Sequence, residues 1–162
     1  MSDCKITLVV VPEYFRLAGL FAFYFVFAST YTITLIWNPT FLTDNAVGNM
    51  MGYNQACTWF DSMPARPYGL WFCNLACFMW FVYAVLSWVR MHQAFKDIAG
   101  MPLSYWIYTI FIVIECFCYS MFCMVFTHLT THNFKFADHV LGFKFLIIAL
   151  CISDVRTIAY NI

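Results

Sequence analysis

The chain has 162 residues, of which 64% are hydrophobic and 10% are charged, whereas soluble domains carry roughly 25% charged residues. Too few polar side chains are present to coat a water-soluble globule, so we expect an integral membrane protein. Eight basic and eight acidic residues give a net charge of zero, and no clustered basic face of the kind that binds nucleic acid is evident. Nucleic acid is therefore not an expected partner.

The first predicted span covers about residues 17–37. Residues 17–43 form a run without a charge, and a helix needs about 20 mostly apolar residues to cross a bilayer. Asn38 and Pro39 are expected to end the helix. Trp37 would then lie at the level of the lipid headgroups, where an amphipathic ring is favoured.

The longest polar segment follows at residues 44–66 and still contains several aromatic side chains, Trp59 among them. A loop of this composition is expected to lie on the membrane surface or under a partner protein. Arg66 closes the segment at the entrance to the next apolar run. We therefore treat Trp59 and Arg66 as candidate contacts to lipid headgroups or a partner.

Two further spans are predicted at about residues 67–89 and 103–131. The first of them lies between Arg66 and Arg90 and contains no charge, and the second contains a single charged residue, Glu115. Both runs are long enough to cross the hydrocarbon core as helices.

The fourth predicted span, at about residues 140–160, contains Lys144, Asp154 and Arg156. An alternative for this segment is a helix that lies in the membrane interface. If residues 140–160 are counted as a span, residues 1–162 are expected to form a single transmembrane domain, an all-α bundle of about four transmembrane helices. Four spans place both termini on the same side of the membrane.

Glu115 lies near the middle of the third span, where an ionised carboxylate is expected to be paired, protonated or functional. The third span descends to Thr131 and the fourth returns from His139, so counting an equal distance back reaches the level of Asp154 and Arg156. We expect Glu115 and Arg156 to form a structural ion pair between two helices. The alternatives are a protonated Glu115 hydrogen-bonded to hydroxyl groups, and a role in proton relay or ligand binding.

Histidines gather at one edge of the predicted bundle. His128 and His132 are four residues apart and share a helix face, and His139 follows in the next loop. A metal site is one alternative, but we favour contacts to headgroups or a partner, because the zincin-type glutamate is absent. The complete set of candidate contacts is Arg66, Trp37, Trp59, His132, Lys135 and His139.

No catalytic, cofactor or metal site is predicted. The predicted spans contain no histidine at mid-membrane depth that could ligate haem, and no nucleophile elbow, phosphate-binding loop or dinucleotide fingerprint occurs. Most of the eight cysteines are expected to act as free, small hydrophobic side chains. The cysteines inside apolar runs are Cys73, Cys77, Cys116, Cys118, Cys123 and Cys151. Bound phospholipids are the only expected ligands.

Two stretches resemble the DRAM-like membrane family, which includes autophagy modulators and GPI-anchor remodelling factors. Residues 62–95 resemble a Pro-x-Arg loop, with Arg66, that enters an aromatic second span. Residues 114–145 resemble a span with a mid-membrane glutamate, followed by a polar loop and a histidine with phenylalanine four residues later. The positions that correspond to the family pattern are Arg66, Glu115, His139 and Phe143. The resemblance implies lipid handling or scaffolding. The chain departs from it in having room for four spans instead of six, and in Cys116 after the glutamate.

The function expected from these features is that of a non-catalytic accessory or structural subunit of a larger membrane complex. A mitochondrial inner-membrane respiratory or ATP-synthase assembly is the predicted host, with its membrane subunits and phospholipids as partners. One alternative is a DRAM-like protein of the endomembrane system that binds or remodels lipid. A second alternative is a small transporter or channel that uses Glu115.

Overall fold

The computed structural model describes residues 10–52, 59–98, 100–131 and 136–160. This part of the chain is helical and contains no strand, which confirms the all-α fold class. In chain order, the elements are α1 (Pro12–Trp37), the 3-10 helix η1 (Pro39–Leu42), α2 (Ala46–Met51), α3 (Ala65–Phe95), α4 (Leu103–Thr131) and α5 (Phe136–Tyr160).

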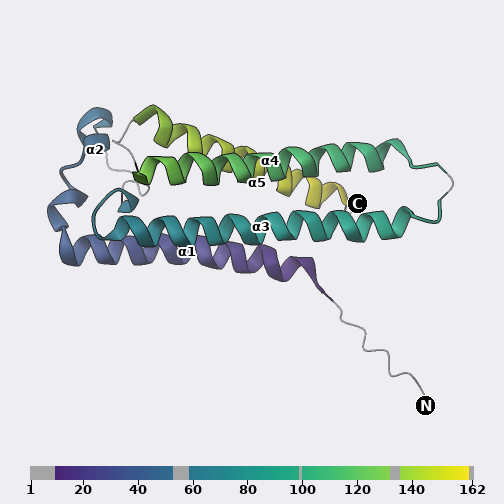
Figure 1. Cartoon of the computed structure of the whole chain (residues 1–162), viewed down its shortest axis with the longest axis horizontal. Coiled ribbons are helices and arrows are strands. Elements are labelled where there is room, and N and C mark those ends of the chain that lie inside the picture. Colours follow the sequence, from purple (N-terminus) through teal and green to yellow (C-terminus); the bar gives the residue numbers. More distant parts are fainter. Residues whose placement is uncertain (1–9, 53–58, 99, 132–135, 161–162) are drawn as a thin grey trace, which may run out of the picture.

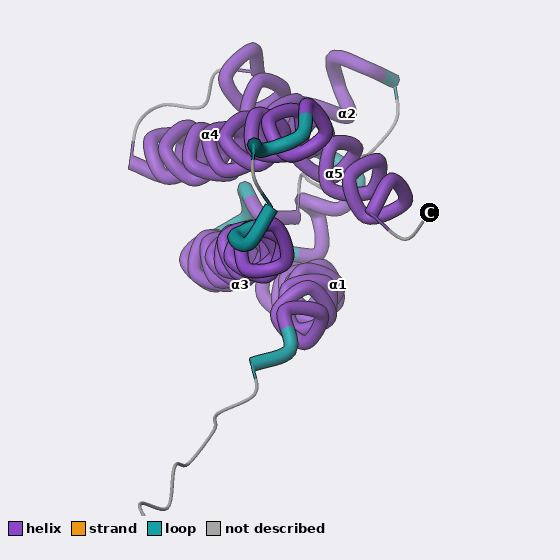
Figure 2. The backbone as a smooth tube through the Cα atoms, turned by 90° about the vertical axis from the view of Figure 1, so that its right-hand side faces the viewer, coloured by secondary structure: helices purple, strands orange, loops and turns teal. Residues whose placement is uncertain are grey.

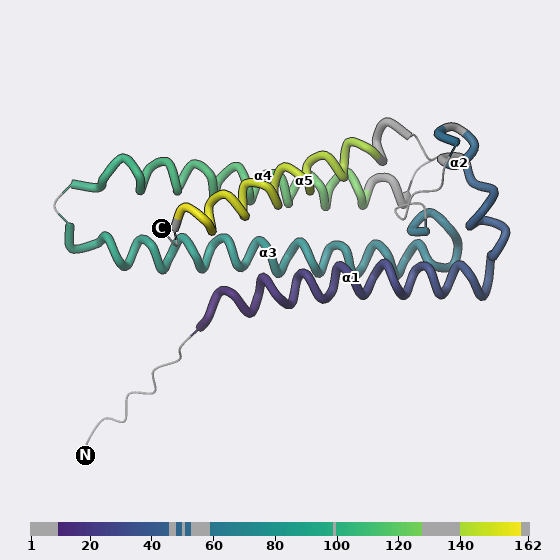
Figure 3. Tube along the Cα trace, turned by 180° about the vertical axis from the view of Figure 1, so that it is seen from behind, coloured from purple at the N-terminus to yellow at the C-terminus, as the bar shows by residue number. Residues whose placement is uncertain are grey.

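The four long helices pack as two antiparallel pairs, α1 with α3 and α4 with α5 (Figure 1). Viewed along the bundle, the α4–α5 pair lies over the α1–α3 pair, and α3 also contacts α4 (Figure 2). Helix α5 runs obliquely across α4, so that its C-terminal end approaches the start of α1 (Figure 3). α3 and α4 continue beyond this level to the turn that joins them (Figures 1 and 3).

Three of the helices, α1, α3 and α4, are long and apolar enough to cross a membrane. The 26 residues of α1 correspond to about 39 Å at 1.5 Å per residue, more than the hydrocarbon core of about 30 Å. α5 has 25 residues, but Lys144, Asp154 and Arg156 interrupt its apolar character. Three of the four predicted spans thus correspond to helices that could cross a membrane, and the count of four is not confirmed.

Two of the helices extend past the uncharged runs that mark the predicted spans. α1 begins at Pro12 instead of near residue 17, and α3 continues to Phe95 instead of ending near residue 89. Pro12 suits the first turn of a helix, because its missing N–H would have no helical partner there. The added turns carry charged side chains that are paired with charges on other helices, as described below.

The contact between α1 and α3 is close because small residues line it. Gly19 on α1 lies against the indole of Trp80, so that an added Cβ atom would come within 2.5 Å of the Trp80 Nε1 atom. Ala22 on α1 and Ala76 on α3 are buried in the same core. Trp80 in turn stacks on Tyr119 of α4, with ring centroids 5.8 Å apart. The stacked rings of Trp80 and Tyr119 therefore link the two helix pairs.

Candidate functional site

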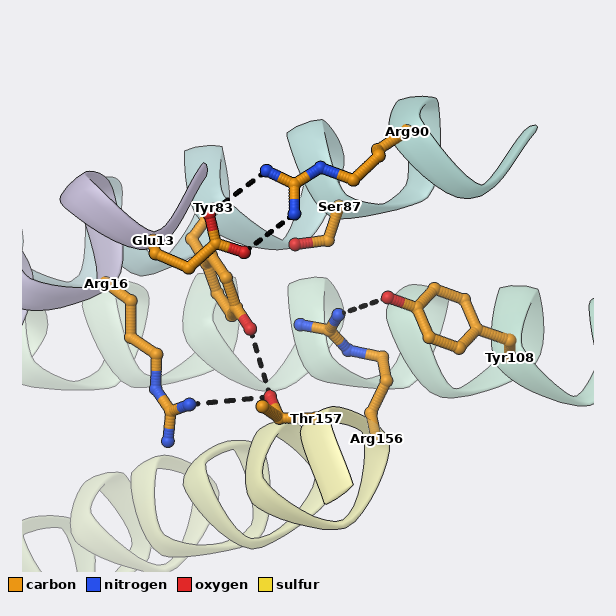
Figure 4. A pocket seen from close by; sticks show the side chains of 8 residues that line it. All are labelled: Glu13, Arg16, Tyr83, Ser87, Arg90, Tyr108, Arg156 and Thr157. Carbon is orange, nitrogen blue, oxygen red and sulfur yellow. Dashed lines mark hydrogen bonds and ion pairs between the residues drawn. The ribbon is translucent and has the colours of Figure 1, made fainter. Parts of the chain in front are cut away.

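A network of charged and hydroxyl side chains lies where α1 begins and α5 ends (Figure 4). All four long helices contribute to it. We call it the polar network, and its members are Glu13, Arg16, Tyr83, Ser87, Arg90, Tyr108, Glu115, Asp154, Arg156 and Thr157.

The most deeply buried part of the network is an ion pair between α4 and α5. Arg156 Nε donates to Glu115 Oε2 at 3.0 Å, and Arg156 Nη2 lies 3.5 Å from Oε1 of the same carboxylate. The Glu115 side chain is 0% exposed and that of Arg156 is 1% exposed. Sequence analysis predicted this pair, because the two residues lie at the same depth in adjacent helices. An unpaired charge at this position would be strongly destabilising.

Aromatic rings surround the Arg156 guanidinium. Its Cζ atom lies 5.0 Å from the ring centroid of Tyr83 and 5.2 Å from that of Tyr108, within the range of cation–π attraction. Arg156 Nη1 also donates to the Tyr108 hydroxyl at 2.6 Å. The guanidinium is therefore held by a carboxylate, a hydroxyl and two ring faces, which fixes its orientation.

Arg16 joins the start of α1 to the end of α5. Its Nη2 atom forms an ion pair with Asp154, and its Nη1 atom lies 3.5 Å from the Thr157 hydroxyl. The Thr157 hydroxyl donates to the Ser153 carbonyl at 2.7 Å. Its single proton is thus used, so in the 3.0 Å contact with Tyr83 the tyrosine hydroxyl is the donor. A continuous chain of hydrogen bonds connects α1, α5 and α3.

A third ion pair joins α1 to α3 at the edge of the network. Arg90 Nη1 and Nη2 donate to the two Glu13 carboxylate oxygens at 2.8 and 3.0 Å. The pair is bidentate, a geometry that only arginine offers to a carboxylate. Both side chains are about half exposed, at 43% for Arg90 and 52% for Glu13. This exposure limits the contribution of the pair to stability.

Sequence reasoning paired Glu115 with Arg156 but missed the other two pairs. The sequence does contain a signal for one of these pairs. Glu13 lies just before the start of one uncharged run, and Arg90 directly follows the end of the next. In an antiparallel helix pair, these two positions lie at the same level.

Two cavities adjoin at the network. The polar cavity has a volume of about 190 Å³, and its lining consists of Glu13, Arg16, Tyr83, Ser87, Arg90, Tyr108, Arg156 and Thr157. The apolar chamber has a volume of about 390 Å³, and its lining consists of Met91, Phe95, Ser104, Tyr105, Ile107, Tyr108, Phe111, Arg156 and Ala159. Tyr108 and Arg156 line both, so they form the partition between the two spaces.

The predicted aromatic contacts lie at the other end of the bundle, away from the polar network. Trp37 ends α1 and is 64% exposed, as a ring in contact with headgroups would be. Trp59 is partly buried, with its ring 4.7 Å from that of Tyr31, and its carbonyl accepts a hydrogen bond from Thr34. Part of the connection before α3 therefore packs against α1.

Arg66 lies in the first turn of α3 and is partly buried. It is close enough to Asp61 for its charge to act on that carboxyl group. Burial raises the pKa of Asp61 to about 7, and the positive charge of Arg66 opposes this rise. Asp61, which lies before α3, is thus a group whose charge changes near neutral pH.

The side chains of the predicted histidine cluster lie outside what the structure describes. His132 and Lys135 are outside the described residues, and for His128 and His139 the structure describes only the helical backbone. Among the described side chains, no group of three or more His, Cys, Asp or Glu residues is placed to hold a metal ion. The six described cysteines are free thiols.

The DRAM-like resemblance rests on Arg66, Glu115, His139 and Phe143. In the structure, Phe143 packs against Phe122 of α4, with ring centroids 5.7 Å apart, as a core side chain would. The resemblance itself stays a prediction. Comparison with protein-family models, with curated proteins and with solved structures finds no match for this chain.

Proposed function

We propose that this chain is a non-catalytic structural subunit of a larger membrane assembly. The observation that carries the proposal is that the polar network joins helices to one another through ion pairs. Arg16–Asp154 joins α1 to α5, Glu13–Arg90 joins α1 to α3, and Glu115–Arg156 joins α4 to α5. Charges used in this way fix the positions of the four helices relative to one another.

The outer surface of the bundle supports the same proposal. Within the most apolar 18-residue stretch of each of the helices α1, α3 and α4, between 28% and 39% of the residues are buried. The remainder face lipid or neighbouring proteins, and they include large side chains such as Phe21, Tyr24 and Trp71, each at least 70% exposed. Since so few residues of these helices are buried within the bundle, neighbouring proteins can pack against it on several sides.

The alternative of a transporter that uses Glu115 is less well supported. A carboxylate that carries protons or ligands needs access to water in at least one state. Glu115 is fully buried and held by Arg156, so its geometry favours the structural role. The mitochondrial inner-membrane host and the DRAM-like alternative stay predictions, because no contact described here bears on the organelle.

Native gel electrophoresis after extraction in a mild detergent tests the proposal. We expect the chain, whose own mass is 19.0 kDa, to migrate in a band several times larger, with the same companion proteins at fixed stoichiometry by mass spectrometry. A harsher detergent that releases the chain provides the reference for its migration alone. Migration as a single chain with lipid under both conditions would contradict a role as a subunit.

A further inference from the structure

We propose that the polar cavity and the apolar chamber together bind one anionic amphiphile, a molecule with a phosphate or carboxylate headgroup and a single hydrocarbon chain. The headgroup would occupy the polar cavity and the chain the apolar chamber, with Tyr108 and Arg156 at the junction. This binding site goes beyond the structural role proposed above and does not depend on it.

The charge of the lining selects an anion. Three arginines, Arg16, Arg90 and Arg156, line the polar cavity against one carboxylate, that of Glu13. The acidic partners of Arg16 and Arg156 are Asp154 and Glu115, which do not line it. The cavity is therefore lined by the arginine of each of these ion pairs and not by its carboxylate. Guanidinium groups bind phosphate and carboxylate oxygens through charge-assisted hydrogen bonds.

The size and the remaining lining of the polar cavity fit a compact headgroup. Its volume of about 190 Å³ equals that of about six water molecules at roughly 30 Å³ each. Hydroxyl groups of Tyr83, Ser87, Tyr108 and Thr157 also line it. Tyr83 and Thr157 already donate their protons within the polar network, so the hydroxyls that can donate to an oxyanion are those of Ser87 and Tyr108. A headgroup with one phosphate or carboxylate fits this space, whereas a large sugar headgroup does not.

The apolar chamber supplies the place for the hydrocarbon chain. Its volume of about 390 Å³ lies within the range of roughly 300–1,000 Å³ that is typical of ligand cavities. Phe95, Phe111 and Ile107 contribute apolar surface to it. Ile107 is 45% exposed and Ala159 is also exposed, so a chain that enters here can continue into the surrounding lipid. Free phosphate would leave this chamber unused.

Binding to the purified full-length chain in phosphatidylcholine nanodiscs tests the proposal. The probes are oleoyl-lysophosphatidic acid and oleate as anions, oleoyl-lysophosphatidylcholine as the zwitterion with the same chain, and inorganic phosphate without a chain. We expect saturable binding of an anionic probe that is at least tenfold tighter than that of the zwitterion. The ratio between the two anionic probes tells whether the headgroup is a phosphate or a carboxylate.

Matched variants separate the two cavities. Ala159→Phe fills the apolar chamber and is expected to weaken anionic-probe binding at least tenfold, whereas Ala18→Phe, at an exposed position of α1 outside both cavities, leaves it unchanged. Ser87→Phe fills the polar cavity and is expected to abolish the preference for anions over the zwitterion. Circular dichroism and gel filtration establish that each variant is folded.

Several outcomes would overturn the proposal. Equal binding of the anionic and zwitterionic probes to the original chain would show that the arginines do not select the headgroup. Equal binding by the Ala159→Phe and Ala18→Phe variants would show that the chamber does not hold the chain. Inorganic phosphate that binds as tightly as the lysophosphatidic acid would assign the cavity to a free anion instead of an amphiphile.

Discussion

Glu115 and Arg156 depend on each other, because both side chains are buried, at 0% and 1% exposure. We expect Glu115→Gln to lower the free energy of unfolding by about 3–5 kcal/mol, since it leaves the Arg156 charge buried without its counter-ion. The double variant Glu115→Leu with Arg156→Met is expected to recover most of this loss, because apolar side chains of similar volume replace a buried pair with little penalty. Thermal unfolding in detergent measures both changes.

The exposed pair at the edge of the polar network provides the matched control. Glu13→Gln removes the negative charge that pairs with Arg90, but both side chains are about half exposed, so we expect a loss below about 1 kcal/mol. Equal losses for Glu115→Gln and Glu13→Gln would contradict a structural role for the buried pair. A stable Glu115→Gln variant would instead favour a carboxyl group that is already protonated.

The buried pair could be predicted because a helix rises by a constant amount per residue, so depth in adjacent helices can be counted along the sequence. The contact between Arg16 and Asp154 could not be predicted in this way. It depends on the oblique path of α5, which brings its C-terminal end toward the start of α1 (Figure 3). A helix crossing angle is set by side-chain packing, and no linear pattern of charges encodes it.

The α1–α3 contact depends on a glycine. We expect Gly19→Ala to destabilise the bundle by about 1–3 kcal/mol, as overpacking of a filled core does, because the added Cβ atom would lie 2.5 Å from Trp80 Nε1. The Trp80 ring cannot easily withdraw, since its Nε1 donates to the Arg16 carbonyl at 3.3 Å and its other side stacks on Tyr119. Thermal unfolding and tryptophan fluorescence report the change.

Gly142 on α5 is the control for this prediction. There an added Cβ atom would lie 3.5 Å from Val125 Cγ1, an ordinary van der Waals contact. Alanine is also the better helix former, by about 1 kcal/mol, so Gly142→Ala is expected to be neutral or stabilising. If both alanine variants unfolded at the same temperature, the close approach of α1 to α3 would not be a determinant of stability.

Helix boundaries were less predictable than the helices themselves. Uncharged runs identify where lipid can surround a helix, but α1 and α3 extend past these runs. The added turns carry Glu13 and Arg90, which pair with each other. The short helix α2 was also missed inside a segment read as loop. Asn45 caps it by accepting a hydrogen bond from the Gly48 N–H at 2.8 Å, and Gly52 ends it at a positive φ of 76°.

The arrangement of the whole bundle bears on the fourth predicted span. α1, α3 and α4 run up and down in turn, and α5 packs antiparallel to α4 over most of its length (Figure 1). Among the charges of α5, Asp154 is paired with Arg16 and Arg156 with Glu115. Pairing offsets the cost that these residues would have in lipid as isolated charges. We therefore propose that α5 crosses the membrane with the other three helices.

Protease protection in sealed vesicles tests this fourfold crossing. Cleavage sites inserted in the α3–α4 connection at residues 96–101 and in a tag after Ile162 are expected to be cut from the same side, because α3 and α5 end at the same end of the bundle (Figure 1). A site inserted at residues 43–45, before α2, is expected to be cut only from the opposite side, and detergent-opened vesicles should expose all three. A helix that lies in the interface would leave the tag on the side of residues 43–45. That result would contradict the proposed fourth crossing.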